Sequence, residues 1–147
     1  MTELSNKIIQ STATLTQQAG SFDPTLYGGT TEGTWAYTTQ QGYYIKIGNL
    51  CYVCIRLKPS SISGAVGTLR VGGLPFAASP SAAAVHLSAF TTGLAWGTSM
   101  TQLQLIISTG NTYGSMYGSA NNAAWVAVDI ADISTGDEIR ISGVYLV

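Results

Sequence analysis

The sequence predicts an all-β fold, a jelly-roll-like antiparallel β-sandwich, and three observations lead to this prediction. Apolar and aromatic residues alternate with small polar ones over residues 34–50 and 67–76, as in strands with one buried face. Glycines divide both stretches into short segments and favour tight turns. Roughly eight short strands follow at intervals of about 8–12 residues, a spacing typical of sandwiches and jelly rolls.

The first twenty residues differ from the rest, so we expect a leader over 1–20 and one β-sandwich domain over 21–147. Leu4, Ile8 and Leu15 fall with Met1 on a loose heptad, which favours one face of a short helix. So few heptads cannot hold together alone. Two interpretations stay open: an adaptor that starts a trimer or docks into another protein, or a frayed leader.

The first half of the domain is expected to form strands joined by tight turns. Pro24 sets an extended start, and Thr34 to Gln40 is expected to be a strand with Trp35, Tyr37 and Thr39 on one face. Gln41-Gly42 is expected to turn the chain into a second strand over 43–47. Gly48-Asn49 then predicts a two-residue hairpin.

The stretch from Leu50 to Leu57 is expected to be a central strand. Both of its faces are apolar up to Arg56, which predicts cover on both sides and therefore a partner subunit. Cys51 and Cys54 fall on opposite faces of such a strand, so we expect two separate thiols rather than a redox or zinc pair.

The second half of the domain is also expected to consist of strands joined by loops. Residues 59–67, 77–84 and 129–138 are expected to be loops. Strands are expected over 69–71, 84–90, 93–96, 102–108, 124–128 and 138–147, with Leu103, Leu105 and Ile107 facing inward.

Composition narrows the classes of partner. Charged residues make up 9% of the chain, against about 25% in typical soluble domains, and the net charge is −1. The six basic residues are scattered, which argues against nucleic acid and against an anionic membrane surface. No apolar run is long enough to insert into a membrane. A surface this poor in charge favours burial in an oligomer interface.

Nothing in the sequence indicates catalysis or a cofactor. The single histidine, His86, is expected to be a strand residue paired with a neighbour, and no serine has a nucleophile-elbow context. Asp129, Asp132 and Asp137 are weak candidates for an irregular calcium site. The stronger interpretation is that this cluster supports turns, so we expect no enzyme, no cofactor and no metal.

A Tyr/Gly/Ser/Asn-rich stretch is the candidate binding loop. Tyr113, Tyr117, Asn121 and Asn122, with Trp96, are candidates for binding glycan, because tyrosine offers a flat apolar face and asparagine paired donors and acceptors. The alternative is that the tyrosines cap the core. Trp35 and Trp125 are expected to pack inside.

Several segments together resemble the carboxy-terminal β-sandwich module of bacteriophage tail fibres and tailspikes. They are an aromatic-x-Pro-x-Leu start at 22–26, a Tyr-x-x-Gln-x-Gly-x-Tyr segment at 37–44, Gly-Leu-Pro-Phe at 73–76 and a closing segment at 136–145. The resemblance extends over most of residues 22–147, with no matching motif over 77–131. Unlike this chain, the family module usually ends a chain of several hundred residues.

This resemblance implies a homotrimeric, non-enzymatic virion protein, assembled in the host cytoplasm, at the tip of a fibre or as a decoration. It implies docking to another virion protein through residues 1–20, and it makes host surface glycan a candidate ligand. Tyr52, Val144 and Leu146 mark the face expected to form the trimer. The alternatives are a free lectin-like carbohydrate-binding module and, more distantly, a glycan hydrolase with a site between subunits.

Overall fold

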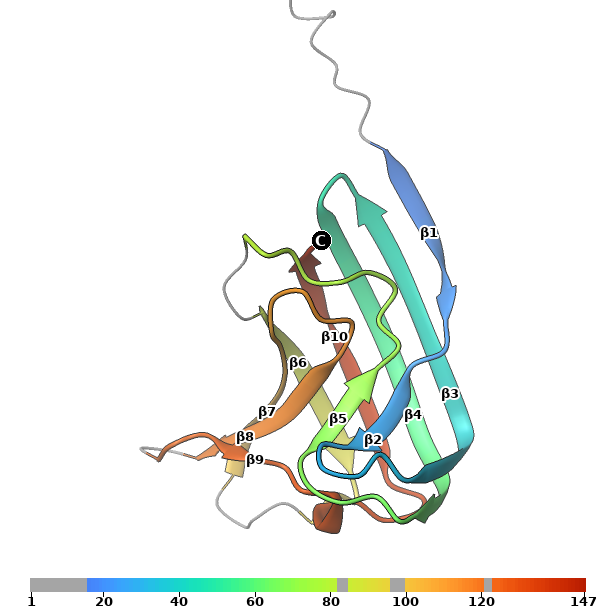
Figure 1. Ribbon diagram of the computed structural model, residues 1–147, viewed down its shortest axis with the longest axis vertical. Helices are drawn as coiled ribbons and strands as arrows, with labels where there is room; N and C mark the ends of the chain where they lie inside the picture. Colours follow the sequence, from blue (N-terminus) through green and yellow to red (C-terminus); the bar gives the residue numbers. More distant parts are fainter. Residues whose placement is uncertain (1–15, 82–84, 96–99, 121–122) are drawn as a thin grey trace, which may run out of the picture.

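The computed structural model describes residues 16–81, 85–95, 100–120 and 123–147, and the expected all-β antiparallel fold is confirmed. Ten strands form one sheet in the order β1-β3-β4-β10-β6-β7-β8-β5-β2, with β9 paired to β8 (Figure 1). The strands are β1 (Gln17–Phe22), β2 (Thr25–Gly28), β3 (Thr34–Ile47), β4 (Leu50–Ser63), β5 (Leu69–Gly72), β6 (Val85–Thr92), β7 (Met100–Ile107), β8 (Gly114–Ala120), β9 (Val126–Ala127) and β10 (Glu138–Leu146). A short 3-10 turn, η1 (Ile130–Asp132), precedes β10, and no helix among the described residues is long and apolar enough to cross a membrane.

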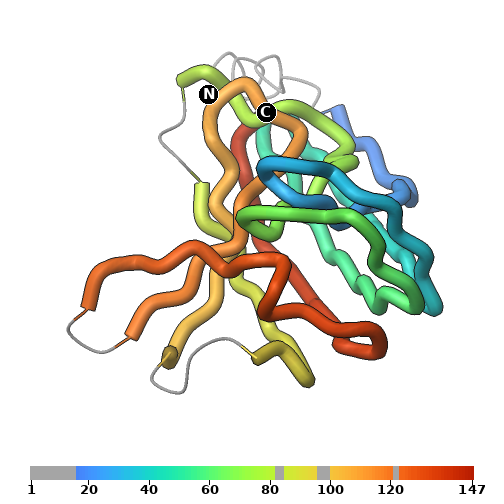
Figure 2. The backbone as a smooth tube through the Cα atoms, turned by 60° about the horizontal axis from the view of Figure 1, so that its bottom comes forward, coloured from blue at the N-terminus to red at the C-terminus, as the bar shows by residue number. Residues whose placement is uncertain are grey.

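The sheet curls until its last strand, β2, lies against β3 (Figure 2). Side chains of β3 fasten this closure. The Tyr37 hydroxyl accepts a hydrogen bond from the Leu26 backbone N–H at 2.7 Å, and the Gln40 side-chain amide donates to the Pro24 carbonyl at 3.0 Å. Both bonds link β3 to the segment that carries β2, so closure depends on side chains where no backbone ladder joins these two strands.

The core fills the interior of the curl. Alternate residues of β4, β7 and β10 are buried, as the period of two requires, and the inward side chains of β3 are half-buried. The inward positions predicted for Leu103, Leu105 and Ile107 are confirmed. On β4 and β10 the fully buried members are Cys51, Val53, Ile55, Leu57, Ile139, Ile141 and Tyr145.

Three segments that are distant in sequence meet around Phe76. The Tyr44 ring packs edge-on against the Phe76 ring, with centroids 5.3 Å apart. The Tyr145 hydroxyl donates to the Phe76 carbonyl at 3.0 Å, and burial raises the pKa of Tyr145 well above its usual 10.0. Through these contacts the segment that follows β5 is joined both to β3 and to β10. They fasten the two halves of the sheet together.

The turn expected at Gln41-Gly42 is wrong, because β3 runs unbroken through both residues. Phe22 on β1 lies opposite Gly42, and a Cβ at Gly42 would lie 2.7 Å from its ring. The glycine therefore makes room for an aromatic ring on the neighbouring strand. The hairpin expected at Gly48-Asn49 is confirmed, since Ile47 pairs with Leu50 across it.

The loop expected over 59–67 is also wrong in its first half, because β4 continues to Ser63. Pro59 lies opposite Tyr37, where the register of the β3–β4 pair shifts. A bulge tolerates proline, which has no N–H to give to the ladder. The same shift places Gln40, rather than the expected Thr39, on the side of Tyr37 that faces β2.

The second half brings three further corrections. Residues 93–95 are not a strand, and Gly93 has a φ of 96° and lies against Asp137. The Tyr/Gly/Ser/Asn-rich stretch expected to be a binding loop contains strand β8, with Met116 fully buried. Trp125 is exposed rather than inside, because β9 is a two-residue strand that covers little.

Candidate functional site

The outer side of β3, β4 and β10 exposes a continuous group of large apolar side chains. The register places Ile45, Tyr52 and Val144 in one row across the three strands, and a second row lies beside it. We call this surface the outer apolar face; it consists of Tyr43, Ile45, Ile47, Leu50, Tyr52, Val144 and Leu146. The core covers the inner side of β4, whereas the described residues leave this outer side exposed.

A charged cluster lies beyond this face on the same side of the sheet. Glu138 lies between Arg56, whose Nε is 2.8 Å from its Oε1, and Arg140, whose Nε bonds the same oxygen. Hydrogen bonds from Arg56 and then from Arg140 lower the pKa of Glu138 to about 2. Glu138 is therefore ionised at any physiological pH.

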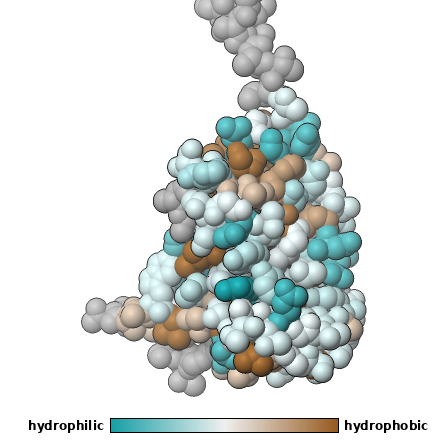
Figure 3. All heavy atoms as spheres, in the orientation of Figure 1, coloured by the Kyte–Doolittle hydropathy of each residue, from teal (hydrophilic) through white to brown (hydrophobic). Residues whose placement is uncertain are grey.

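The opposite side of the molecule, where β2 and β5 lie nearest the viewer, looks different. Figure 3 shows hydrophobic atoms there in small patches separated by polar ones. Scattered apolar residues of this kind are ordinary on a protein surface. The continuity of the outer apolar face is what distinguishes it.

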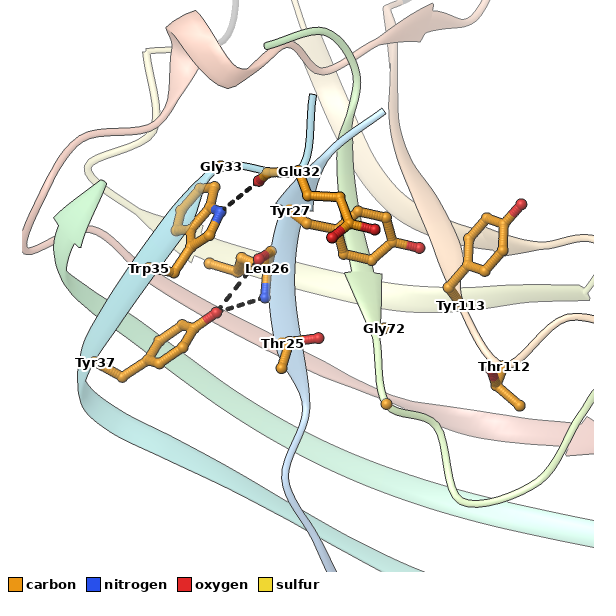
Figure 4. A pocket seen from close by; sticks show the side chains of 11 residues that line it. Thr25, Leu26, Tyr27, Glu32, Gly33, Trp35, Tyr37, Gly72, Thr112 and Tyr113 are labelled. Carbon is orange, nitrogen blue, oxygen red and sulfur yellow. Dashed lines mark hydrogen bonds between the residues drawn. The ribbon is translucent and has the colours of Figure 1, made fainter. Parts of the chain in front are cut away.

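A groove of about 390 Å³ opens between β2, β3, β5 and the segment before β8 (Figure 4). We call it the Tyr27 groove; the residues that matter for its chemistry are Thr25, Tyr27, Glu32, Trp35, Thr112 and Tyr113. The Trp35 indole N–H donates to the Glu32 carbonyl at 3.0 Å. Tyr37 is held by its bonds to Leu26, so both β3 aromatics have fixed positions at the groove.

Arg70 lies against the two tyrosines of the aromatic wall. Its guanidinium carbon lies 5.2 Å from the Tyr113 ring centroid, and Tyr113 meets the Tyr27 ring edge-on with centroids 6.0 Å apart. Burial raises the pKa of Tyr27, and the charge of Arg70 partly opposes the shift. Gly72 leaves space for the Tyr27 ring, since a Cβ there would lie 2.8 Å away.

The structure separates the residues that were predicted to bind glycan. Tyr113 lines the Tyr27 groove, whereas Tyr117 lies within β8 opposite Gln104 and Ala127 and does not line it. Trp96, Asn121 and Asn122 lie outside the described residues, as do Leu4, Ile8 and Leu15 of the leader.

Tyr27, Glu32 and Trp35 line the groove but were not predicted as site residues. Trp35 was expected to pack inside, and it is half-buried. A local signal was present, since two aromatic residues and a carboxylate stand close together over 27–35 between glycines. Their proximity to Tyr113 depends on the fold.

The acidic cluster supports turns, as its stronger interpretation held. Asp129 accepts from the Ala131 N–H, and Asp132 accepts from the Asp129 N–H, which together cap η1. Asp137 accepts from the Ser134 N–H at 2.7 Å. Across the part of the chain that the structure describes, no three His, Cys, Asp or Glu side chains are grouped as metal ligands.

The expectations for histidine and the cysteines are confirmed. His86 is an exposed residue of β6, with Nδ1 2.9 Å from Oε1 of Gln104 on the neighbouring strand. Cys51 is buried and Cys54 is exposed, on opposite faces of β4, and both are free thiols. Burial raises the pKa of the Cys51 thiol.

Comparison with known proteins gives a fold and no family. No model of a protein family matches the chain, and no curated protein matches it. The structure is similar to the crystal structure of the Dettilon tailspike protein, with a TM-score of 0.70 over 88% of this chain at 18% sequence identity. The chain spans 23% of the length of that tailspike chain. The fold is thus one that occurs in a phage tailspike, which agrees with the resemblance drawn from the sequence at the level of fold.

Proposed function

We propose that the chain is a non-enzymatic structural module of a bacteriophage virion, part of a tail fibre or tailspike, and that it assembles as a homotrimer. The fold shared with a tailspike supports the location, and the outer apolar face supports the assembly. In this proposal the curled sheet is a β-sandwich of the jelly-roll class, with β1, β3, β4 and β10 as the layer that meets the other subunits.

The outer apolar face is the observation that carries the proposal. Monomeric soluble proteins rarely expose a contiguous apolar patch of more than a few hundred Å². Tyrosines and aliphatic side chains with few charges are typical of the centre of a subunit interface. Copies of the same chain are the simplest partner, because most soluble oligomers are symmetric homo-oligomers.

The oligomeric mass tests the assembly. Light scattering coupled to size-exclusion chromatography should give three times the mass of one chain. The double variant Y52T/V144T should dissociate, because it removes an aromatic ring and puts a hydroxyl in place of a methyl group at the centre of the apolar rows. Val126→Thr is the matched control for Val144→Thr, because Val126 is 50% exposed and Val144 is 51% exposed. Val126 lies outside the outer apolar face, so this variant should keep the wild-type mass. A stable monomer of wild-type protein would contradict the assembly and favour the free lectin-like module.

Docking to another virion protein through residues 1–20 is part of the same proposal. Strand β1 begins at Gln17 and pairs with β3 from that residue onward. The appropriate truncation therefore removes residues 1–15 and leaves the sheet whole. It should abolish incorporation into particles and preserve the oligomeric mass.

Host surface glycan is the proposed ligand of the assembled module, and the Tyr27 groove supports this role with its aromatic and hydroxyl lining. Glycoside hydrolysis generally needs two carboxyl groups flanking the scissile bond, and the groove lining brings Glu32 alone among the described carboxylates. Incubation with host polysaccharide should release no new reducing ends. Their release would establish the hydrolase alternative.

A further inference from the structure

We infer that the Tyr27 groove binds an uncharged hexose unit, presented by a glycan of the host surface. The inference rests on the proposed function for the source of the glycan and adds the sugar class and the residues that select it. A volume of about 390 Å³ lies within the usual range for small-molecule sites, about 300–1,000 Å³.

The walls of the groove provide ring faces at fixed positions. Tyr27 and Tyr113 are packed edge to face, and the Arg70 guanidinium lies over the Tyr113 ring. The N–H of Trp35 is already bonded to the Glu32 carbonyl, so Trp35 contributes its apolar surface to the groove. The apolar face of a hexose ring, lined by C–H groups, suits such aromatic surfaces.

Polar groups stand among these rings. The Glu32 carboxylate and the hydroxyls of Thr25 and Thr112 belong to the same lining (Figure 4). A carboxylate only accepts hydrogen bonds, whereas a threonine hydroxyl both donates and accepts. Neighbouring hydroxyls of a hexose can satisfy both kinds of group at once.

The charge of the lining selects against acidic sugars. Glu32 is the charged residue of the groove lining. Arg70 is not among the residues that line the groove, although its charge acts on the Tyr27 phenol, so Glu32 is the charged group that a bound sugar would contact directly. A uronate or sialate would bring a second negative charge toward Glu32, so the groove favours a neutral ring.

An aromatic groove can also accept a proline-rich peptide. Proline has no backbone N–H, so such a peptide offers few donors to the Glu32 carboxylate. The hydroxyls of a sugar offer several. The lining therefore favours the glycan over the peptide.

The test is a titration of the isotopically labelled full chain followed by nuclear magnetic resonance. The probes are methyl glycosides of glucose, galactose and mannose, methyl glucuronide, and a short proline-rich peptide. At least one neutral glycoside should shift the Trp35 indole N–H and leave that of Trp125 unmoved, while methyl glucuronide binds at least fivefold more weakly. Glu32→Gln should weaken the binding of the neutral glycoside at least fivefold. It should also reduce the ratio of the affinity for the neutral glycoside to the affinity for methyl glucuronide. Tyr113→Ala should weaken the binding of the neutral glycoside at least tenfold.

Asp23→Asn is the matched control for the charge, because Asp23 is an exposed carboxylate that does not line the groove. It should leave the affinity unchanged. The inference is overturned if no neutral glycoside binds, if the glucuronide or the peptide binds better, or if Glu32→Gln has no effect. Measuring the oligomeric mass on the same sample separates the two proposals. A trimer that binds no sugar refutes the groove alone, and a monomer that binds sugar refutes the trimer alone.

Discussion

Glu138 holds together a cluster of three charged residues, which it forms with Arg56 and Arg140. The carboxylate takes hydrogen bonds from Arg56 and Arg140, which are opposite each other on β4 and β10. Only 14% of its side chain is exposed, against 46% for Arg56 and 59% for Arg140. The one acid thus links two basic residues that would otherwise repel each other across the strand pair.

The lowered pKa of Glu138 predicts a defined loss of stability in acid. Because the folded pKa lies below the ordinary 4.5, the stabilisation is fully present above 4.5 and is lost as the pH falls toward about 2. Denaturant unfolding of wild type and Glu138→Gln from pH 7 to pH 2 measures it. The variant should be less stable at pH 7, and its curve should fall less steeply in the acid interval. Parallel curves for the two proteins would refute the assignment.

Other residues show which features the sequence could predict at the scale of the residue and which it could not. The alternation of apolar residues was enough to predict the buried face of β7 and the opposite orientations of Cys51 and Cys54. It could not predict the role of Gly42, because the ring that covers this glycine belongs to a strand twenty residues earlier. When only its neighbours in the sequence are considered, a glycine predicts a turn.

At the scale of the element, β3 is the strand that organises the groove. It carries Trp35 and Tyr37, pairs with β1 and β4, and meets β2 through side chains. Tyr37 contributes most directly, since its hydroxyl both accepts from the Leu26 N–H and donates to the Leu26 carbonyl. The position of β2 against β3 thus depends on this phenol together with the Gln40 amide, which donates to the Pro24 carbonyl.

Tyr37→Phe should loosen β2 selectively. The change leaves the Leu26 N–H without its partner, at a cost of about 1–3 kcal/mol in the free energy of unfolding. Amide hydrogen exchange should accelerate at Leu26, while the amides of β4 keep their protection relative to global unfolding. Unchanged exchange at Leu26 would show that other contacts hold β2 in place.

The same scale explains why only part of the candidate site was predicted. Tyr113 was found because its local composition is that of a binding loop, although the stretch that follows it forms β8. Tyr27 and Glu32 reach the groove through a closure that joins the β2 end of the sheet to β3. The contacts of this closure join residues 11 and 16 positions apart. Tyr27 and Tyr113 meet from 86 positions apart, because β2 pairs with β5 and β5 pairs with the start of β8. No local period encodes either contact.

For the whole molecule, the decisive question is what covers the outer apolar face. The sequence already indicated cover, since both sides of β4 are apolar, and the structure shows that the described part of the chain leaves the outer side exposed. A low overall charge agrees with a surface that is partly buried by other subunits.

Cys54 offers a direct probe of that question. It lies on the outer side of β4 between Tyr43 and Ser142, at the border of the outer apolar face, whereas Cys51 is buried inside. If three copies meet through this face, a maleimide should label Cys54 slowly in the wild-type trimer and at least tenfold faster in Y52T/V144T. Mass spectrometry should find one label per native chain and two only after unfolding, because Cys51 stays covered in both proteins. Fast labelling of a wild-type protein whose mass is trimeric would mean that the subunits meet elsewhere, and the outer apolar face would then be free for another virion protein.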